Sequence, residues 1–368
     1  KLSVDMVVVA PDDPLVLGMV DALNAVGIKT FGPNKMAAAI EGSKVFSKNL
    51  MEKFDIPTAK YQIFSNANDA ISYVKSEKSY PTVIKADGLA FGKGVIIAET
   101  EKEAVDAITS IMEDKIFGES GKYLVVEEFL TGPEVSVLAF CDGETVIPMV
   151  SSMDHKRAND CDQGLNTGGM GAIAPNPYYT KEISNECMKK IFLPTVKAMK
   201  SVGRPFKGCL YFGLMLTRTG AKVIEYNCRF GDPEAQVILP LLDTDLVDIF
   251  DAVFDGTLDK MEIKWKRKSC ACVIIASGGY PQKYETGIEI NGLNEKGQLE
   301  NAFVYHSGTK HQSDKFLTAG GRVLGVTATG LTLKLALSRA YLAVRKIKFT
   351  DEHYRKDIGK KALKDQKN

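Results

Sequence analysis

A glycine-rich loop that carries basic residues lies between two strand-like runs, Val83–Lys85 and Val95–Ala98. The backbone N–H groups of Gly92 and Gly94 can approach phosphate oxygens closely, and Lys93 can neutralise their charge. P-loops and dinucleotide-binding loops open into a helix whose N-terminus faces the phosphate, but this loop opens into a strand. The pattern therefore predicts either a strand–loop–strand flap over a phosphate-bearing ligand or an ordinary hairpin with a flexible tip.

A second candidate site is the alternating run Val223–Arg229. Side chains two positions apart share one face of a strand, so Glu225, Asn227 and Arg229 are expected on the same face. The opposite face would carry Ile224, Tyr226 and Cys228. Carboxylate and amide oxygens suit Mg²⁺ beside a nucleotide, and the guanidinium could hold a carboxylate or a phosphate. The alternative is the solvated outer face of an edge hairpin.

Composition limits the classes of protein that fit. The chain has 368 residues, 45% of them hydrophobic and 25% charged, which predicts a globular protein of two or three domains. A net charge of +1 gives no broad electrostatic footprint for nucleic acid, and no apolar run is long enough to span a membrane. The seven cysteines are scattered and Cys270–Cys272 has no second metal-like pair, which favours a reduced, cytoplasmic chain without a zinc site.

The beginning of the chain reads as a parallel α/β unit. A strand at Asp5–Ala10, a turn at Pro11–Leu15, a helix at Val16–Val26 and a strand at Ile28–Phe31 follow one another. Since the sequence starts at its first visible strand, we expect at least one further βαβ unit, roughly 30 residues or more, upstream.

The remaining elements alternate between the periods of helices and strands. A helix at Ser43–Phe54 precedes a small α+β lid, and a compact α/β region follows the polar boundary at Lys264–Ser269. The lid would contain helices Ala67–Ser76 and Lys102–Met112 with strands Val83–Lys85, Val95–Ala98 and Tyr123–Glu128. Downstream we expect strands Leu138–Phe140, Thr145–Met149, Leu210–Leu216 and Lys222–Cys228, and helices Ile183–Val202 and Asp245–Asp255. The last region would contain strands Cys270–Ala276, Ala302–His306 and Arg322–Thr329 and helix Leu331–Val344.

Several motifs, in order along nearly the whole chain, resemble glycinamide ribonucleotide synthetase (phosphoribosylamine–glycine ligase), a family within the ATP-grasp superfamily. The most specific is Asn227-Cys228-Arg229-Phe230-Gly231-Asp232-Pro233-Glu234. Others are Glu41–Lys44, Ile84–Ala90, Gly92–Val95, Val126–Leu130, Asp154–Arg157, Asn166–Ala172, Gly278–Pro281, His306–Thr309, Gly320–Val323 and Tyr354–Gly359. The motifs after residue 270 distinguish this family from other ATP-grasp ligases.

The resemblance implies an α/β protein with the ATP-grasp fold, in which two α+β subdomains clamp ATP. A truncated amino-terminal parallel α/β (pre-ATP-grasp) domain would occupy residues 1–47. The ATP-grasp domain would occupy residues 48–255, with its lid at about 60–126 and its base at about 127–255. A small carboxy-terminal α/β domain would occupy residues 265–368.

The resemblance also implies residue roles. Metal ligands for Mg²⁺ or Mn²⁺ would be Glu225 and Asn227, and glycine and the amine would be positioned by Asp154, Arg229 and Asp232. Contacts to ATP would come from Lys44, Lys85, Gly92, Lys93, Gly94, Glu127, Glu128, Phe129, Leu130, Glu134, Arg157 and Asn166. Among these, Lys44 and Lys85 would reach the phosphates, Glu127–Leu130 the adenine, and Glu134 the ribose. His155 could be a general base or a surface residue.

The implied reaction is the ATP-dependent ligation of glycine to 5-phosphoribosylamine through glycyl phosphate, in purine biosynthesis. Partners would be small molecules, without nucleic acid or membrane, and the chain would be a monomer or a weak homodimer. The sequence departs from the family at Asp12, at Leu165 and at Phe91, and the family's first strand and glycine-rich turn are not present upstream of Lys1.

Two alternatives remain open from the sequence. One is another ATP-grasp carboxylate–amine ligase, such as a carboxylase-type subunit. The other is a chain that binds ATP without catalysis because the amino-terminal substrate site is missing.

Overall fold

The computed structural model describes residues 4–89 and 94–365, and these residues form two compact units. Unit 1 comprises residues 1–148, 180–230 and 246–262, and unit 2 comprises residues 149–179, 231–245 and 263–368. No helix among the described residues is both long and apolar enough to cross a membrane.

Unit 1 begins with a parallel strand pair, as expected, in which β1 (Met6–Val8) pairs with β2 (Lys29–Phe31). The connection differs from the predicted turn and single helix, because it holds α1 (Asp12–Leu17) and α2 (Met19–Ala25). Pro11 is extended and precedes the first helical residue, and Gly18, with φ of 97°, separates the two helices.

Two further helices follow, α3 (Lys35–Gly42) and α4 (Lys44–Lys53). The predictions missed α3, which begins where the Asn34 side chain accepts a hydrogen bond from the Ala37 amide at 2.8 Å. The prediction of α4 is confirmed.

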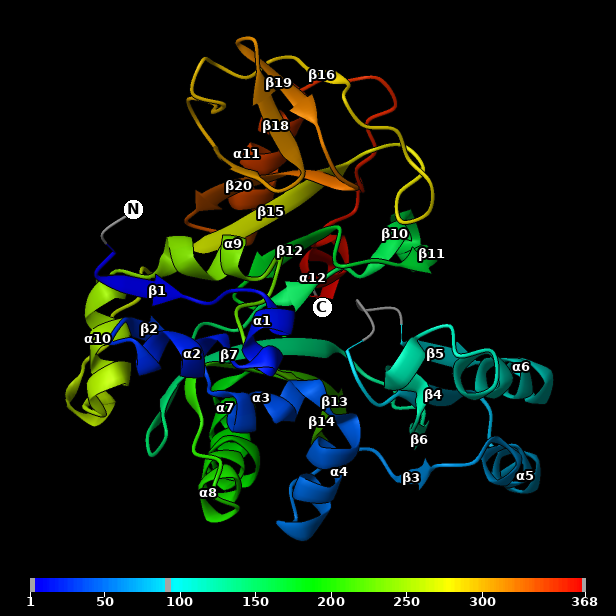
Figure 1. Cartoon of the computed structure of the whole chain (residues 1–368). Coiled ribbons are helices and arrows are strands. Elements are labelled where there is room, and N and C mark those ends of the chain that lie inside the picture. The colour runs from blue at the N-terminus through cyan, green and yellow to red at the C-terminus, as the bar shows by residue number, and fades with distance from the viewer. Residues whose placement is uncertain (1–3, 90–93, 366–368) are drawn as a thin grey trace. The chain divides into compact units, whose positions relative to one another are not determined.

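The lid of unit 1 is a four-stranded antiparallel sheet in the order β3–β6–β4–β5. Its strands are β3 (Tyr61–Phe64), β4 (Thr82–Ala86), β5 (Val95–Ala98) and β6 (Leu124–Glu128). Helices α5 (Ala67–Glu77) and α6 (Glu101–Met112) pack against it through a shared apolar cluster, and Figure 1 shows them beside each other. The strand–loop–strand prediction is confirmed, since β4 pairs directly with β5, while Phe91, Gly92 and Lys93 lie outside the described residues.

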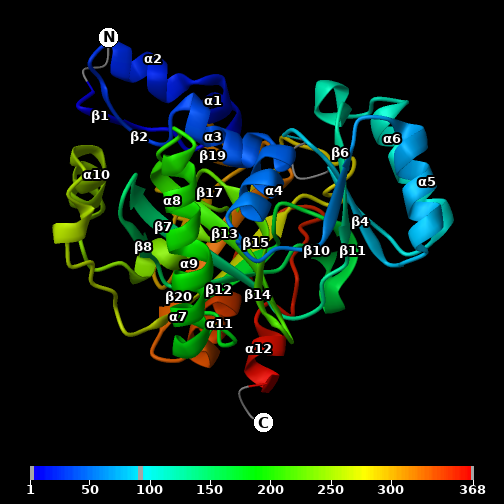
Figure 2. The same ribbon diagram turned by 90° about the horizontal axis from the view of Figure 1, so that it is seen from below.

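The base of unit 1 is a second antiparallel sheet in the order β14–β13–β7–β8. Its strands are β7 (Glu134–Asp142), β8 (Val146–Pro148), β13 (Lys207–Thr217) and β14 (Gly220–Asn227), which confirms the four strands predicted here. One helical stretch runs along it through α7 (Lys181–Cys187), a π-helical turn (Met188–Phe192) and α8 (Leu193–Ser201), seen in line in Figure 2. Phe192 contacts Phe212 of β13 with ring centroids 4.4 Å apart, and α10 (Leu246–Asp255) also contacts the sheet.

Unit 2 is built on a five-stranded sheet in the order β17–β20–β15–β12–β9. These strands are β9 (Met153–Asp154), β12 (Gly171–Ala174), β15 (Ser269–Ala276), β17 (Phe303–His306) and β20 (Arg322–Gly330). The predicted helix before the chain end, α11 (Leu333–Val344), packs on β15 and β20 and buries one apolar cluster between them.

Smaller elements complete unit 2. The two-stranded ribbon of β10 (Arg157–Asn159) and β11 (Gln163–Asn166) is joined by a 3-10 turn (Asp160–Asp162). A three-stranded sheet holds β16 (Glu289–Ile290), β19 (Lys315–Thr318) and β18 (Thr309–Gln312). The short helices are α9 (Ala235–Ile238), a 3-10 turn (Leu239–Leu241) and α12 (Lys360–Asp365), and unit 1 has 3-10 turns at Gly118–Gly121 and Leu258–Lys260.

The connection between lid and base, residues 129–133, contains one glycine, Gly132, whose replacement by alanine tests the fold. Gly132 has φ of 149°, and a Cβ added there would lie 2.0 Å from the Leu216 carbonyl oxygen. We expect Gly132→Ala to lower the free energy of unfolding by at least about 2 kcal/mol more than Gly203→Ala. Gly203 is the matched control, because it also has positive φ (74°) but open space around it. Urea unfolding of both variants checks this, and equal losses would contradict it.

Candidate functional site

The start of α4 is tied to the beginning of the glycine-rich loop. The Asp87 carboxylate accepts hydrogen bonds from the Val45 amide (2.7 Å) and the Ser43 hydroxyl (2.9 Å), and Ser43 itself accepts one from the Phe46 amide (3.0 Å). Lys44, in the first turn, donates to the Gly88 carbonyl at 3.1 Å. The first helical residues and the end of β4 are therefore held against each other.

Charged side chains from three elements converge around Lys44. Burial lowers the pKa of Lys44, and the neighbouring Lys85 lowers it further, while Glu225, Asp87 and Glu41 raise it. The structure therefore brings together Lys44, Lys85 and Glu225, which lie far apart in the sequence. The surroundings of Lys44 therefore contain a second ammonium group and several carboxylates.

Lys85 itself is buried and makes two polar contacts at 3.0 Å, one with the Glu127 carboxylate and one with the Ile224 carbonyl. A second buried lysine, Lys48, lies 3.1 Å from the other Glu127 oxygen. The sequence analysis missed Lys48, although it stands four residues after Lys44 and thus shares its helix face.

Strand β14 presents the predicted alternation, with one irregularity. Glu225, Asn227 and Arg229 are half-buried, whereas Tyr226 and Cys228 are buried. The pairing with β13 shifts register between Gly213 and Leu214, which leaves Ile224 as an extra residue. Ile224, which we expect on the same face as Tyr226 and Cys228, is half-buried where they are buried, and its carbonyl receives the Lys85 hydrogen bond.

Arg229 is held in place by several neighbours. It forms an ion pair with Glu41 at 3.1 Å and donates to the Asn227 side-chain oxygen (3.3 Å) and the Phe230 carbonyl (3.2 Å). Burial raises the pKa of Glu41, although Arg229 and the Cys228 amide, which donates at 2.7 Å, oppose this. Glu41 thus orients Arg229, a role that the motif containing it did not reveal.

The predicted adenine and ribose contacts lie where lid and base join. The Glu127 carboxylate faces Lys85 and Lys48, so its side chain is buried rather than solvated. Burial alone would raise the pKa of Glu128, but hydrogen bonds from Lys222 (2.7 Å) and the Lys60 amide (2.9 Å) lower it overall. The residues that follow Glu128 include exposed Phe129, half-buried Leu130 and exposed Glu134. At the flap, the Gly94 carbonyl accepts a hydrogen bond from the Ala86 amide at 2.9 Å.

The donor set on β14 fits Mg²⁺. Glu225 and Asn227 offer a carboxylate and an amide oxygen from one strand face, and the described residues contain no cluster of three His, Cys, Asp or Glu side chains able to hold a metal. Mg²⁺ beside nucleotides commonly takes one or two protein oxygens and completes its shell with phosphates and waters. Two oxygen donors therefore suit a nucleotide-bound Mg²⁺ better than a metal held by protein ligands alone.

The other predicted site residues belong to unit 2. Asp154, in β9, accepts from the His155 amide at 2.7 Å and lies 3.7 Å from the Lys156 ammonium. Arg157 and Asn166 are brought opposite each other by the β10–β11 ribbon, and Arg157 donates to the Gly164 carbonyl at 2.9 Å. These two residues therefore stand on paired strands rather than in an irregular loop.

Asp232 is fixed by an arginine that the sequence analysis quoted only within a motif. Arg322 forms an ion pair with the Asp232 carboxylate at 2.9 Å and donates to the Asp232 carbonyl (2.8 Å) and the Gly168 carbonyl (2.9 Å). The Gln236 amide donates to the other Asp232 carboxylate oxygen at 2.7 Å. Gly169, with φ of 112°, follows immediately, and a Cβ there would lie 2.6 Å from an Asp154 oxygen. This close approach joins the segments that carry Asp154 and Asp232.

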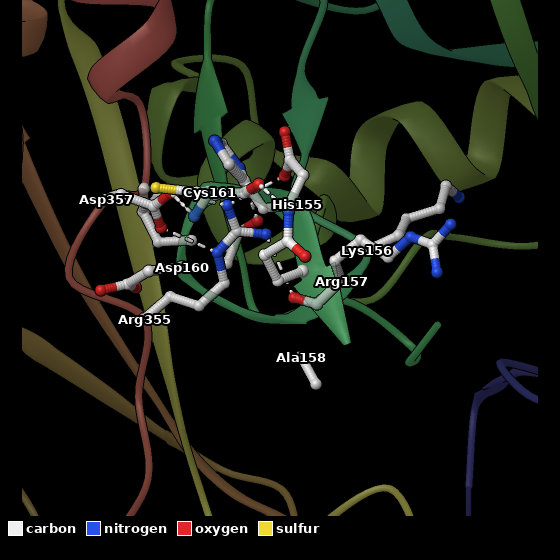
Figure 3. A network of polar contacts seen from close by, with 12 residues as sticks. His155, Lys156, Arg157, Ala158, Asp160, Cys161, Arg355 and Asp357 are labelled. Atoms are coloured by element: carbon white, nitrogen blue, oxygen red, sulfur yellow. Dashed lines mark hydrogen bonds and ion pairs between the residues drawn. The ribbon is translucent and has the colours of Figure 1, made fainter. Parts of the chain in front are cut away.

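A buried arginine anchors the ribbon from the end of the chain, as Figure 3 shows. The Arg355 guanidinium contacts Asp357 (2.8 and 3.0 Å) and Asp162 (2.9 Å) and donates to the Arg157 carbonyl (3.1 Å). Asp357 in turn accepts from the Cys161 amide at 2.8 Å. Burial tends to raise the pKa of Asp357, but these donors outweigh it and lower the pKa to about 2.

His155 lies within the same network and is buried, so the prediction of a surface position is wrong. Its Nε2 accepts a hydrogen bond from the Gly359 amide at 3.0 Å, and its Nδ1 is 3.2 Å from the Gly171 carbonyl. Burial and the nearby Arg355 lower the pKa of His155 to about 4. Both ring nitrogens are thus engaged in holding the fold, which disfavours a role as general base.

Comparison with known proteins gives consistent matches along the chain. The family model of the phosphoribosylglycinamide synthetase ATP-grasp (A) domain matches residues 42–235. The models of the N and C domains of the same synthetase match residues 1–41 and 270–361. A phosphoribosylamine–glycine ligase of Rhodopirellula baltica is 50% identical over 367 residues, which is 98% of this chain and 84% of that relative.

Solved structures give the same fold. A crystal structure of phosphoribosylamine–glycine ligase from Thermotoga maritima superposes with a TM-score of 0.82 at 33% identity, covering 90% of this chain and 82% of that one. Biotin carboxylase from Campylobacter jejuni superposes with a TM-score of 0.74 at 15% identity, covering 95% of this chain and 76% of that one. The second likeness shows the fold alone, and the two together confirm the predicted ATP-grasp architecture.

The lowered pKa of His155 predicts a pH-dependent stability. The unfolded chain protonates this imidazole near its ordinary pKa of about 6.5, whereas the folded chain resists protonation down to about 4. The neutral His155 imidazole therefore contributes fully to the free energy of unfolding above about pH 6.5, and this contribution is lost as pH falls toward 4. About 2 kcal/mol of it is lost between pH 7 and pH 5.

Urea unfolding at pH 7 and pH 5 measures this loss. Between pH 7 and pH 5, the free energy of unfolding should fall less in His155→Asn than in the unsubstituted chain. In His311→Asn, at an exposed histidine of unit 2, it should fall as much as in the unsubstituted chain. The same drop in His155→Asn as in the unsubstituted chain would contradict the prediction.

Proposed function

The chain belongs to the phosphoribosylglycinamide synthetase family, and on that premise we propose which of its residues carry out the reaction. The protein is an ATP-dependent ligase that forms a carbon–nitrogen bond between glycine and phosphoribosylamine in purine biosynthesis. The observation that supports the residue assignment most directly is the convergence of Lys44, Lys85 and Glu225 at the start of α4.

Lys44 and Lys85 bind the phosphates of ATP in this proposal. Both side chains leave regular elements at fixed points, and both lie beside the first residues of the flap between β4 and β5. Gly92, Lys93 and Gly94 are assigned to phosphate binding by the resemblance, and exclusion of water would protect the acyl phosphate from hydrolysis. Phosphoryl transfer needs positioning and charge neutralisation more than covalent help, which two lysines in a partly buried site supply.

The other nucleotide contacts are proposed from the resemblance, residue by residue. The backbone of residues 127–130 faces the adenine, and Glu134 binds the ribose hydroxyls. Arg157 and Asn166, which the β10–β11 ribbon holds opposite each other, are also assigned to nucleotide binding by the resemblance. We also propose the three-domain division at residues 1–47, 48–255 and 265–368, and a chain that is a monomer or a weak homodimer.

Glu225 and Asn227 would hold Mg²⁺ or Mn²⁺ on the half-buried face of β14. When bound with ATP, the metal would neutralise part of the phosphate charge during transfer of the γ-phosphoryl group. Arg229, which contacts Glu41 and Asn227, would bind a carboxylate or phosphate oxygen with its guanidinium. Asp154 and Asp232 position the glycine ammonium and the attacking amine.

The reaction proceeds in two displacements. A glycine carboxylate oxygen attacks the γ-phosphorus of ATP, the bond to the β-phosphate oxygen breaks, and ADP and glycyl phosphate form. The amine nitrogen of phosphoribosylamine then attacks the glycyl carbonyl carbon, loses a proton, and displaces inorganic phosphate. The products are glycinamide ribonucleotide, ADP and phosphate.

The metal assignment predicts the behaviour of one carboxylate. Glu225→Ala should abolish glycine-dependent ADP release at saturating Mg²⁺, because one of two protein oxygens that hold the metal is lost. The matched control is Glu182→Ala, at an exposed glutamate of unit 1 in the first turn of α7. A coupled assay of ADP release with and without glycine measures both variants. Near-normal turnover of Glu225→Ala would remove Glu225 from the metal site.

A further inference from the structure

Lys48 is a fully enclosed lysine that the reaction described above does not use. It is 2% exposed, projects from α4, and lies 3.1 Å from Glu127. Glu127 is 4% exposed, and its other oxygen lies 3.0 Å from Lys85. The Glu127 carboxylate is therefore shared between the Lys48 and Lys85 ammonium groups. These three side chains together carry one net positive charge.

This sharing matters because Lys85 is the proposed phosphate ligand. A phosphate oxygen that engages the Lys85 ammonium competes with Glu127 for it. If Lys85 were the sole partner of Glu127, binding would leave a carboxylate buried without a cation, which is strongly unfavourable. With Lys48 in place, the carboxylate keeps a cation at 3.1 Å whichever way Lys85 turns.

Lys48 is also fixed independently of Lys85. Its ammonium donates to the Thr58 hydroxyl at 2.8 Å, and that hydroxyl donates to the Val223 carbonyl at 2.7 Å. Val223 adjoins Ile224, whose carbonyl receives the Lys85 hydrogen bond. The two ammonium groups are thus anchored to neighbouring carbonyls of β14, and the Lys48 anchor does not depend on a nucleotide.

We propose that Lys48 is the resident counter-ion of Glu127, a positioning residue that leaves Lys85 available to a nucleotide phosphate. The inference rests on the proposed role of Lys85 as a phosphate ligand. Lys48 acts through Glu127 and touches no substrate. Its effect should therefore appear in ATP affinity and depend on the charge of Glu127.

The test uses the full chain with three substitutions at this cluster. Lys48→Met should raise the KM for ATP and the dissociation constant of a non-hydrolysable ATP analogue about tenfold, with kcat changed much less, since Glu127 then retains Lys85. Lys48→Arg keeps the charge and should bind the analogue within about twofold of the unsubstituted chain. In Lys48→Met/Glu127→Gln the neutral amide releases Lys85, so that most of the lost affinity should return.

Lys53→Met is the matched control, because Lys53 is an exposed lysine at the end of the same helix. It should leave KM and analogue affinity unchanged. Thermal unfolding verifies that each variant is folded, and Lys48→Gln, which retains a donor for Thr58, replaces Lys48→Met where the latter does not fold.

The outcomes separate the inference from the proposed function. Unchanged analogue binding by Lys85→Met would overturn the role of Lys85 and the inference with it. Weakened binding by Lys85→Met, with Lys48→Met behaving like Lys53→Met, would overturn the inference alone. Weakened binding by Lys48→Met that Glu127→Gln does not restore would also overturn it, because Lys48 would then act by a route other than the Glu127 charge.

Discussion

The ammonium group of Lys85 joins the lid sheet and the base sheet of unit 1. Its strand, β4, belongs to the lid, whereas Ile224, which accepts its hydrogen bond, belongs to the base. A buried cation needs a buried anion, and Glu127 of β6 provides it at 3.0 Å. This contact therefore links β4 and β6 of the lid to β14 of the base.

The features that the sequence predicted well are local ones. The alternation of Glu225, Asn227 and Arg229 requires only that the segment be a strand, because the period of two is a property of the strand itself. The β4–β5 hairpin follows in the same way from two apolar runs around a glycine-rich loop. The ATP-grasp architecture, by contrast, was inferred from a resemblance between motifs and not from these patterns.

The features that escaped prediction depend on partners distant in the sequence. Ile224 leaves the alternating pattern because the register of β14 shifts against β13, which no property of β14 alone reveals. Lys48 and Glu41 look like ordinary surface charges in a helical sequence, yet each is buried against a residue more than 70 positions away. Arg355 is similar, since its partner Asp162 precedes it by 193 residues. A buried charge is defined by its tertiary partners, so its role emerges only with the fold.

Arg355 also illustrates why a buried ionic network is kept where apolar packing would be simpler. Well-packed apolar side chains often match a buried ion pair in stability, so stability alone does not account for a guanidinium here. Apolar side chains could not, however, accept the hydrogen bond of the Cys161 amide or donate to the Arg157 carbonyl, as Asp357 and Arg355 do. These directional contacts hold the first residue of β10 and the middle of the turn that joins β10 to β11. The segment near the chain end thereby sets the geometry of the β10–β11 ribbon that presents Arg157 and Asn166. Apolar side chains at the same positions would not fix the ribbon in this way.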